Sequence, residues 1–252
     1  MVAVTRFARA ELVLVAALAV VAIAIFSFAE MADDIMEGDT EAFDRFVLQA
    51  MRTPGDLSDP IGPKLMEIAM ADLTALGGMA VLAAIAIVVS GFLLIQRRSM
   101  AVMALWTALL GGLALSQTLK RAFGRERPPA EYQAAEAINA SFPSGHAMLS
   151  AIAFLTLGAL VAKSQPKRRL KTYVMVVAVL LTLIVGVTRV YLGVHWATDV
   201  LAGWCVGVAW ATTCWATARL IERLHGKAGM SRPQHGLNPP HPSSTPAPAT
   251  GE

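Results

Sequence analysis

His195 and Asp199 are the residue pair in this sequence that is best suited to nucleophilic chemistry. They are four residues apart, so on a helix they would share one face, and the Asp199 carboxylate could accept a hydrogen bond from one ring nitrogen. That bond would fix the tautomer and leave the other nitrogen free to attack. Trp196, Ala197 and Val200 supply an apolar surround. The competing interpretation is a structural His–Asp pair that caps the last apolar segment.

A second histidine, His146, follows Pro143, Ser144 and Gly145 directly before another apolar run. Ser144 is a good N-cap, and Gly145 lets a ligand approach the backbone. A helix start presents free N–H groups and a positive dipole end, which together form an anion site. A simple helix cap is the alternative. However, a positive helix end disfavours a cation, so His146 does not serve dipole stability there.

Five basic residues lie near these motifs, at what we expect to be the outer ends of apolar segments. Cations there need a reason, because positive charge normally collects on the cytoplasmic side. One reason is structural, since Lys and Arg side chains snorkel toward headgroups or pair with acidic loops. The other is a bound anion, because an Arg fork and a Lys point charge suit phosphate oxygens. The five are Lys120, Arg121, Arg125, Arg127 and Arg189.

Together these residues match the needs of phosphoryl transfer, which are positioning, charge neutralisation, a nucleophile and an acid. The motifs lack a carboxylate cluster for magnesium, so we expect a metal-independent reaction with no cofactor. Cys205 and Cys214 give no zinc signature, because no histidine lies at ligand spacing. Nine residues also place them on opposite faces of a helix, which argues against a mutual disulfide.

The composition indicates a membrane protein. Of the 252 residues, 56% are hydrophobic and only 15% are charged, whereas a soluble domain carries about a quarter charged residues. The net charge of +3 is small, and the basic residues lie beside apolar runs. A nucleic-acid-binding protein would show a basic stripe instead. We therefore expect a membrane lipid as the partner and no nucleic acid.

Six apolar segments approach the length of about 20 residues that a membrane-spanning helix needs. They predict an all-α, polytopic membrane protein with six transmembrane helices. The segments are 12–29, 75–95, 101–119, 146–162, 172–187 and 200–218.

Segment 40–52 predicts a short amphipathic helix on the extracytoplasmic side, packed along the membrane surface. Asp39 or Thr40 would cap it, and its apolar residues recur at helical spacing. These residues are Phe43, Phe46, Val47, Ala50 and Met51.

The chain divides into two parts by composition. Residues 1–225 form the six-span membrane domain, whose motifs lie within 120–199. Residues 226–252 are rich in Gly, Pro, Ser, Thr and His, which is typical of a disordered tail. We expect this tail to be cytoplasmic.

The Lys and Arg residues of the short loops predict the orientation. They gather before the first span, in the loops around residues 97 and 163–171, and after the last span. That side is expected to be cytoplasmic, so both termini are cytoplasmic and the motifs face outward from a plasma (inner) membrane. Arg6, Arg9 and the small residues Ser27 and Ala29 also fit a cleaved signal peptide. The apolar run exceeds the usual length of about 7–15 residues, which favours a retained anchor.

The three motifs, taken in order, resemble the signature of the type 2 phosphatidic acid phosphatases, a family related to the vanadium haloperoxidases. That signature is Lys-x6-Arg-Pro, then Pro-Ser-Gly-His, then Ser-Arg-x5-His-x3-Asp. All three spacings match, and the six-helix layout extends the likeness across about 10–225. Thr188 replaces the usual serine but retains the hydroxyl. The matching segments run from Lys120 to Pro128, from Pro143 to His146 and from Thr188 to Asp199.

The resemblance implies a role for each matching residue. His195 would attack phosphorus and form a phosphohistidine, Asp199 would orient His195, and His146 would protonate the leaving oxygen. The signature fixes no role for Arg121 and Arg125. The phosphate would be bound by Lys120, Arg127, Arg189, Ser144 and the Gly145 N–H.

We therefore expect hydrolysis of a lipid phosphate or diphosphate at the outer membrane face. Undecaprenyl diphosphate, phosphatidylglycerol phosphate and phosphatidate all fit the motifs. A non-catalytic lipid-binding or transport protein with the same pocket is the alternative, although a transporter more often places ionisable residues near the bilayer midplane. A vanadate-dependent haloperoxidase is a further alternative, but such relatives are typically soluble, and six spans argue against it.

Overall fold

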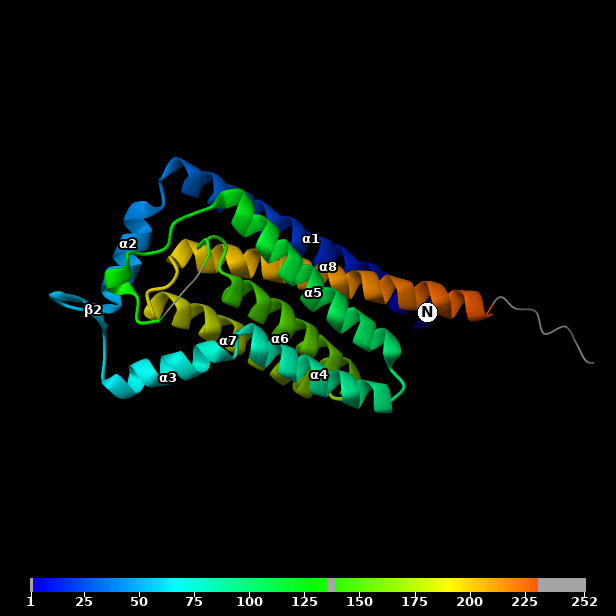
Figure 1. Cartoon of the computed structure of the whole chain (residues 1–252). Coiled ribbons are helices and arrows are strands. Elements are labelled where there is room, and N and C mark those ends of the chain that lie inside the picture. The colour runs from blue at the N-terminus through cyan, green and yellow to red at the C-terminus, as the bar shows by residue number, and fades with distance from the viewer. Residues whose placement is uncertain (1, 136–138, 231–252) are drawn as a thin grey trace, which may run out of the picture. The chain divides into compact units, whose positions relative to one another are not determined.

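The computed structural model describes residues 2–135 and 139–230, most of which lie in long helices (Figure 1). A β-hairpin and a short 3-10 helix, η1 (Ala130–Tyr132), lie in the connections. The α-helices are α1 (Val2–Glu37), α2 (Glu41–Ala50), α3 (Lys64–Ala75), α4 (Met79–Ile95), α5 (Ser99–Phe123), α6 (Gly145–Ser164), α7 (Arg168–Tyr191) and α8 (Ala197–Met230).

Five helices in the described part of the chain are long and apolar enough to cross a membrane, namely α1, α5, α6, α7 and α8. The pair α3 and α4, bent by 50° at a short break, makes a sixth span if it is counted as one. The predicted fold class, all-α with six transmembrane helices, is therefore confirmed in outline. The chain is a multi-pass membrane protein.

The second span differs from the continuous helix expected over 75–95, because α3 ends at Ala75 and α4 begins at Met79. Gly77 explains the break. A side chain there would collide with Val185 of α7, and its Cβ would lie only 3.3 Å from the His146 carbonyl oxygen of α6. The bare backbone at Gly77 thus brings the break in the second span against the start of α6.

The predicted amphipathic helix forms as α2, but a different side of it is buried. Asp44 and Leu48 are each 1% exposed, whereas Phe43 and Phe46 are 50% and 70% exposed. The exposed phenylalanines remain available for the predicted packing of this helix along the membrane surface. Asp44 keeps the other side of α2 against the protein, because its carboxylate pairs with the part-buried Arg125.

An antiparallel hairpin of β1 (Arg52–Thr53) and β2 (Asp56–Pro60) follows α2. The sequence did not predict these strands, which are short and mostly exposed. Gly55 makes the turn at φ +90°, a conformation that favours glycine. The Arg52 side chain donates to the backbone carbonyls of Tyr191, at 2.8 Å, and Tyr132, at 2.6 Å. It thereby ties the hairpin to the end of α7 and to η1.

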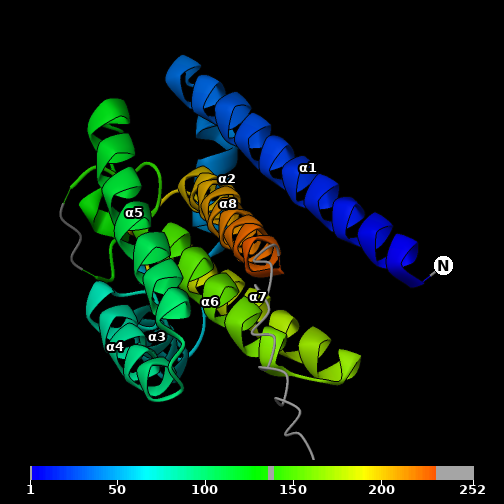
Figure 2. The ribbon, with the colours of Figure 1, turned by 90° about the vertical axis from the view of Figure 1, so that its right-hand side faces the viewer.

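Helix α6 forms the centre of the core and packs against α5 and α7 (Figure 2). Helix α8 approaches α6 through two glycines. A Cβ on Gly203 would lie 2.7 Å from the Ser144 carbonyl oxygen, and one on Gly207 would lie 2.7 Å from Cβ of Ala151. Small residues spaced by four allow such close helix packing in membranes. This packing holds the start of α8 beside the start of α6.

Helix α1 lies at the edge of the bundle in Figure 2. Only 6% of its apolar window is buried within the protein, which suits a helix that faces lipid. Its contact with the core is made near its C-terminal end, where Phe28 stacks on Phe142 at 5.6 Å between ring centroids.

The chain divides into two units, residues 1–218 and 219–252. Helix α8 continues to Met230, so residues 226–230 of the segment expected to be a disordered tail are helical. The remainder of that segment, 231–252, lies outside the described residues.

Candidate active site

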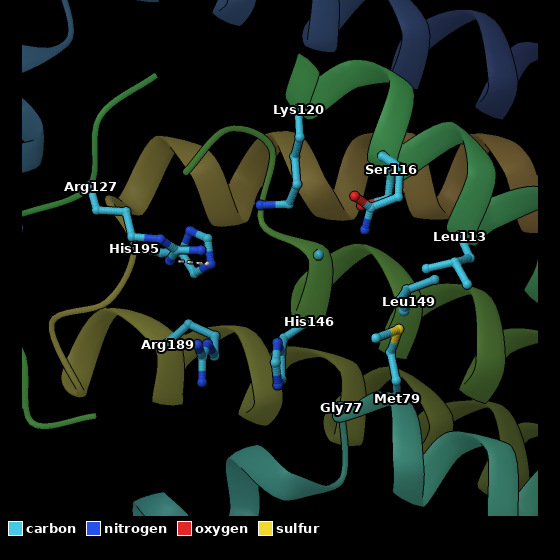
Figure 3. Close-up of a pocket in the computed structure, with 12 residues that line it drawn as sticks. Gly77, Met79, Leu113, Ser116, Lys120, Arg127, His146, Leu149, Arg189 and His195 are labelled. Atoms are coloured by element: carbon cyan, nitrogen blue, oxygen red, sulfur yellow. Dashed lines mark hydrogen bonds between the residues drawn. The ribbon is translucent and has the colours of Figure 1, made fainter. Parts of the chain in front are cut away.

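The residues predicted from the sequence converge on one cavity of about 210 Å³. Ser144 and Asp199 are not in its lining, but both are fully buried directly behind it. The Ser144 N–H donates to the Asp199 carbonyl at 2.9 Å and so joins the starts of α6 and α8. The six that line the cavity are Lys120, Arg127, Gly145, His146, Arg189 and His195 (Figure 3).

His195 lies in the turn between α7 and α8, not within a helix as its spacing to Asp199 suggested. Asp199 lies in the first turn of α8, and its Oδ2 is 3.4 Å from His195 Nδ1. The same oxygen accepts from the Trp196 N–H at 3.0 Å, as a carboxylate in the first turn of a helix commonly does. His195 and Asp199 therefore pair as expected, but a turn followed by a capped helix start brings them together, not a shared helix face.

Gly193 makes this turn possible. Its φ is +69°, in the left-handed region that favours glycine. A side chain at this position would also collide with the Tyr132 carbonyl of η1. The turn therefore fits closely under η1 and aims the following residues at the cavity.

The neighbours of His195 define its tautomer. Ser141 Oγ donates to Asp199 Oδ2 at 2.5 Å and lies 3.2 Å from His195 Nδ1, so Nδ1 is the protonated nitrogen and donates. On the other edge of the ring, Nε2 lies 3.2 Å from a guanidinium nitrogen of Arg127. Since Arg can only donate, Nε2 carries the lone pair. The nitrogen that faces the cavity is thus the nucleophilic one.

The His195 ring is also kept neutral. It is 2% exposed, and burial lowers the pKa of His195 to about 4, although Asp199 acts in the opposite direction. A neutral imidazole is the form that attacks an electrophile. At pH 7 the nucleophile is therefore ready without prior loss of a proton.

Three cations from three parts of the chain surround the cavity. Lys120 belongs to the last turn of α5, and its Nζ donates to the Ala140 carbonyl. Arg189 belongs to the last turn of α7 and donates to Thr74 Oγ1 of α3 at 3.2 Å. Arg127 follows α5, and burial lowers the pKa of Arg127, although a guanidinium stays charged in proteins. The combined positive charge of these three side chains favours the binding of an anion in the cavity.

The start of α6 brings a buried hydroxyl group close to the cavity. Ser144 is the N-cap residue, as expected, but its side chain makes no capping hydrogen bond. In the described part of the chain, Ser144 Oγ and Arg189 Nε are two of only four buried side-chain polar atoms without a hydrogen-bond partner. Buried polar groups normally have partners. Arg189 lines the cavity, so its free Nε is suited to a ligand oxygen, whereas Ser144 Oγ lies behind the lining.

The cavity is polar at one end and largely apolar at the other. Arg127, Arg189 and His195 lie on one side of His146, while Met79, Leu113 and Leu149 lie on the other (Figure 3). Ser116 and Gln117 of α5 also line the cavity. The arrangement fits a ligand with an anionic group at the His195 end and an apolar group at the other end, with His146 beside the bond between them.

The described residues contain no cluster of three or more His, Cys, Asp or Glu side chains of the kind that holds a metal ion. The three cations of the cavity would repel a metal ion, whereas Arg and Lys side chains bind phosphate oxygens well. The same cavity therefore supports phosphate binding through protein groups.

Sequence reasoning missed four residues that surround Asp199. The resemblance gave Arg125 no role, and Asp44 was not among the predicted site residues. Arg125 contacts Asp199 Oδ1 and Asp44 Oδ2, each at 2.7 Å. The hydroxyls of Ser141 and Thr198 complete the cluster. Ser141 and Thr198 lie within or beside the motifs, which could have drawn attention to them; Asp44 gave no such signal.

Comparisons with known proteins show the family to which the chain belongs. The family model described as the PAP2 superfamily matches residues 101–222. Phosphatidylglycerophosphatase B from Bacillus subtilis (strain 168) is 31% identical over 153 residues, which make up 58% of this chain and 71% of that protein. Undecaprenyl-diphosphatase from Sulfolobus acidocaldarius is 36% identical over 67 residues, which make up 27% of this chain and 28% of that protein.

Two solved structures share the fold. A transmembrane PAP2-type phosphatidylglycerolphosphate phosphatase from Bacillus subtilis superposes with a TM-score of 0.74 at 24% identity, over 81% of this chain and 98% of that one. LpxE from Aquifex aeolicus superposes with a TM-score of 0.50 at 23% identity, over 62% of this chain and 88% of that one. This chain therefore shares its helical arrangement with both solved structures.

Proposed function

Because this chain belongs to the PAP2 superfamily of membrane phosphatases, we propose that it hydrolyses a lipid phosphomonoester through a phosphohistidine on His195. The observation that carries the proposal is the position of His195 Nε2. Its lone pair faces a cavity bounded by three cations, while Nδ1 is held by Asp199 and Ser141. This arrangement supplies the nucleophile and charge neutralisation that phosphoryl transfer requires.

In the first step, Nε2 of His195 forms a bond to phosphorus as the bond from phosphorus to the lipid oxygen breaks. The electron pair goes to the lipid oxygen, which takes a proton from His146 and leaves as an alcohol. The negative charge of the bound phosphate offsets the three cations and so lets His146 hold that proton. Lys120, Arg127 and Arg189 neutralise the charge on the transferred group.

In the second step, water attacks phosphorus and the N–P bond breaks. His146, which gave up its proton in the first step, accepts a proton from the water. Inorganic phosphate leaves, and Nε2 regains its lone pair. No metal enters either step, because the three cations of the protein take the charge-stabilising role.

We favour a phosphomonoester because of how charge is distributed in the cavity. A diphosphate would place the charge of a second phosphate on the leaving side of His146. The residues labelled on that side in Figure 3 are apolar or neutral, including Met79, Leu113 and Leu149. A glycerolipid monoester fits better, because no second phosphate is bonded directly to the transferred one. Phosphatidate has no second phosphate, and phosphatidylglycerol phosphate carries its second phosphate as a diester beyond a glycerol unit. A similar protein bears the name of the latter activity. Undecaprenyl diphosphate is the disfavoured member of the set.

We also propose that the site faces outward from the plasma membrane, with both termini cytoplasmic. The Lys and Arg residues of the 163–171 loop, opposite the motif ends of α6 and α7, support this orientation. Cysteine labelling tests it, in a variant with both native cysteines replaced by alanine. A cysteine at Glu126 should react with an impermeant maleimide on intact cells, and one at Ser164 should not. The opposite pattern would reverse the proposed orientation.

The function is tested by phosphate release from purified protein in detergent and EDTA. Phosphatidylglycerol phosphate, phosphatidate and undecaprenyl diphosphate are compared by kcat/KM. The proposal expects a monoester to be preferred, activity to persist in EDTA, and His195→Ala to reduce turnover by on the order of 10³-fold or more. Preference for the diphosphate would overturn the substrate class. Near-normal turnover of His195→Ala would overturn the mechanism.

A further inference from the structure

Asp44 and Arg125 contact the site from behind without lining the cavity. Asp44 is 1% exposed and the Arg125 side chain 15%. Asp44 also lies outside the residues 101–222 that the family model matches. We propose that the two are positioning residues: Arg125 orients the Asp199 carboxylate, and Asp44 fixes Arg125. This inference rests on the proposed role of His195. It adds the two residues that keep Asp199, and through it His195, in position.

Arg125 divides its guanidinium between two carboxylates. One terminal nitrogen, NH1, donates to Asp199 Oδ1 at 2.7 Å and to Thr198 Oγ1 at 2.9 Å. The other, NH2, donates to Asp44 Oδ2 at 2.7 Å. The planar guanidinium therefore fixes the distance and angle between the two acids, which a lysine ammonium cannot do.

The two oxygens of Asp199 consequently have separate partners. Oδ2 meets His195 Nδ1 and accepts from the Trp196 N–H and the Ser141 hydroxyl. Oδ1 is bound by Arg125. Without Arg125, this buried oxygen would lose its charged partner, and the carboxylate could rotate away from His195. An acid that orients a histidine must itself be oriented, as metal-binding histidines and their partners show.

Asp44 joins the start of α8 to α2. Its Oδ1 accepts from the Thr198 N–H at 2.9 Å, and its Oδ2 accepts from the Thr198 hydroxyl at 2.6 Å. The N–H groups in the first turn of a helix have no partner within the helix. A carboxylate from α2 therefore caps the helix that carries Asp199. The positions of α2 and of the nucleophile become linked.

Charge gives a second reason for Asp44. Arg125 alone would cancel the charge of Asp199, whose negative potential favours the positive charge that His195 gains on bonding to phosphorus. With Asp44 present, two carboxylates and one guanidinium leave a net negative charge behind the ring. Asp44 thus allows Arg125 to hold Asp199 without neutralising it.

The test compares Asp44→Asn and Arg125→Gln with the control Arg45→Met. Arg45 also lies on α2 and pairs with a carboxylate, but its side chain is 68% exposed. We expect each test variant to lower kcat by about 10- to 100-fold, as loss of an orienting partner does. KM should change by no more than about threefold. Arg45→Met should match the parent. Thermal unfolding confirms that each variant is folded, and Arg125→Gln serves if Asp44→Asn does not fold.

Two readouts separate positioning from a merely structural role. In an Asp199→Asn background, the Asp44 and Arg125 substitutions should cost no more than about twofold, because coupled residues are non-additive. By ¹⁵N NMR, each single variant should shift the His195 tautomer in the direction that Asp199→Asn shifts it.

Losses of the same size in both backgrounds, with an unchanged tautomer, would overturn the positioning role. If Asp199→Asn itself retains full turnover, the proposed mechanism fails, which is a different result from failure of this inference.

Discussion

Arg127 places a guanidinium nitrogen 3.2 Å from Nε2 of His195, so a cation of the cavity directly meets the nitrogen that we propose as the nucleophile. The same side chain donates to the Val194 carbonyl at 2.6 Å and to the Asn139 carbonyl at 2.9 Å. Two backbone carbonyls therefore fix the guanidinium before any substrate binds. Such preorganised charge stabilises a transition state without reorganisation during the reaction.

Arg127→Lys should therefore be a poor substitute. Lysine keeps the charge but cannot hold both carbonyls and a phosphate oxygen with a planar fork. We expect kcat/KM for the lipid substrate to fall by about 10²-fold, measured as phosphate release. Arg121→Lys is the matched control, because Arg121 is exposed on α5 and should leave kcat/KM unchanged. Equal activity of both variants would mean that charge alone suffices at position 127.

The acid titration of His195 should lie near pH 4. Burial lowers its pKa to about 4, below the ordinary value of about 6.5. As the pH falls below 6.5, the unfolded chain takes up this proton first. The stability contributed by the neutral ring is thus complete above about pH 6.5 and is lost toward pH 4. ¹³C NMR of labelled histidine, assigned with His195→Gln, measures the midpoint, and the acid limb of kcat/KM should follow it. A midpoint near 6.5 would contradict a buried neutral ring.

His146→Gln should separate the two chemical steps. An alkyl leaving group needs a proton, whereas a nitrophenolate leaves without one, so general acid catalysis matters only for the first. With p-nitrophenyl phosphate, the variant should release a burst of one nitrophenolate per protein and then slow, because water attack lacks its base. With a lipid ester it should show no burst. Equal steady loss with both substrates would exclude His146 as the acid.

Gly203→Ala should disturb the joint between α6 and α8. The new Cβ would lie 2.7 Å from the Ser144 carbonyl oxygen, which is backbone and cannot move alone. Overpacking of this kind costs about 1–3 kcal/mol, so the thermal midpoint and turnover should both fall. Gly91→Ala is the control, since a Cβ there meets nothing within 4 Å and alanine favours a helix. An unaffected Gly203→Ala would show that the two helices can move apart freely.

The sequence predicted most of the cavity because its residues occur in short, regularly spaced motifs. His146, His195, Lys120 and Arg189 all reach the cavity, as their positions at span ends implied. The orientation of Asp199 was less predictable, because a turn that needs Gly193 replaces the helix assumed between it and His195. The spacing thus predicted the pairing of His195 with Asp199 correctly, but it predicted the wrong backbone conformation between them.

The remaining differences come from contacts between distant segments. Asp44 is 81 residues before Arg125, and nothing in either local pattern connects them. The apolar spacing of α2 predicted packing along the membrane surface and did not indicate that Asp44 and Leu48 face the protein interior. In a membrane protein apolar side chains are stable facing lipid, so hydrophobicity alone does not identify the inward face.

The convergence of Lys120, Arg127 and Arg189 has a thermodynamic consequence beyond catalysis. The three like charges come together, and repel one another, only in the folded protein. An oxyanion that relieves this repulsion therefore binds to the folded protein and not to the unfolded chain. Such linkage raises the melting temperature in proportion to RT ln(1 + [L]/Kd). Inorganic phosphate, the product, should therefore act as a stabilising ligand, and vanadate should do the same through identical contacts. The charge that serves the reaction also ties the stability of the membrane bundle to the local concentration of its own product.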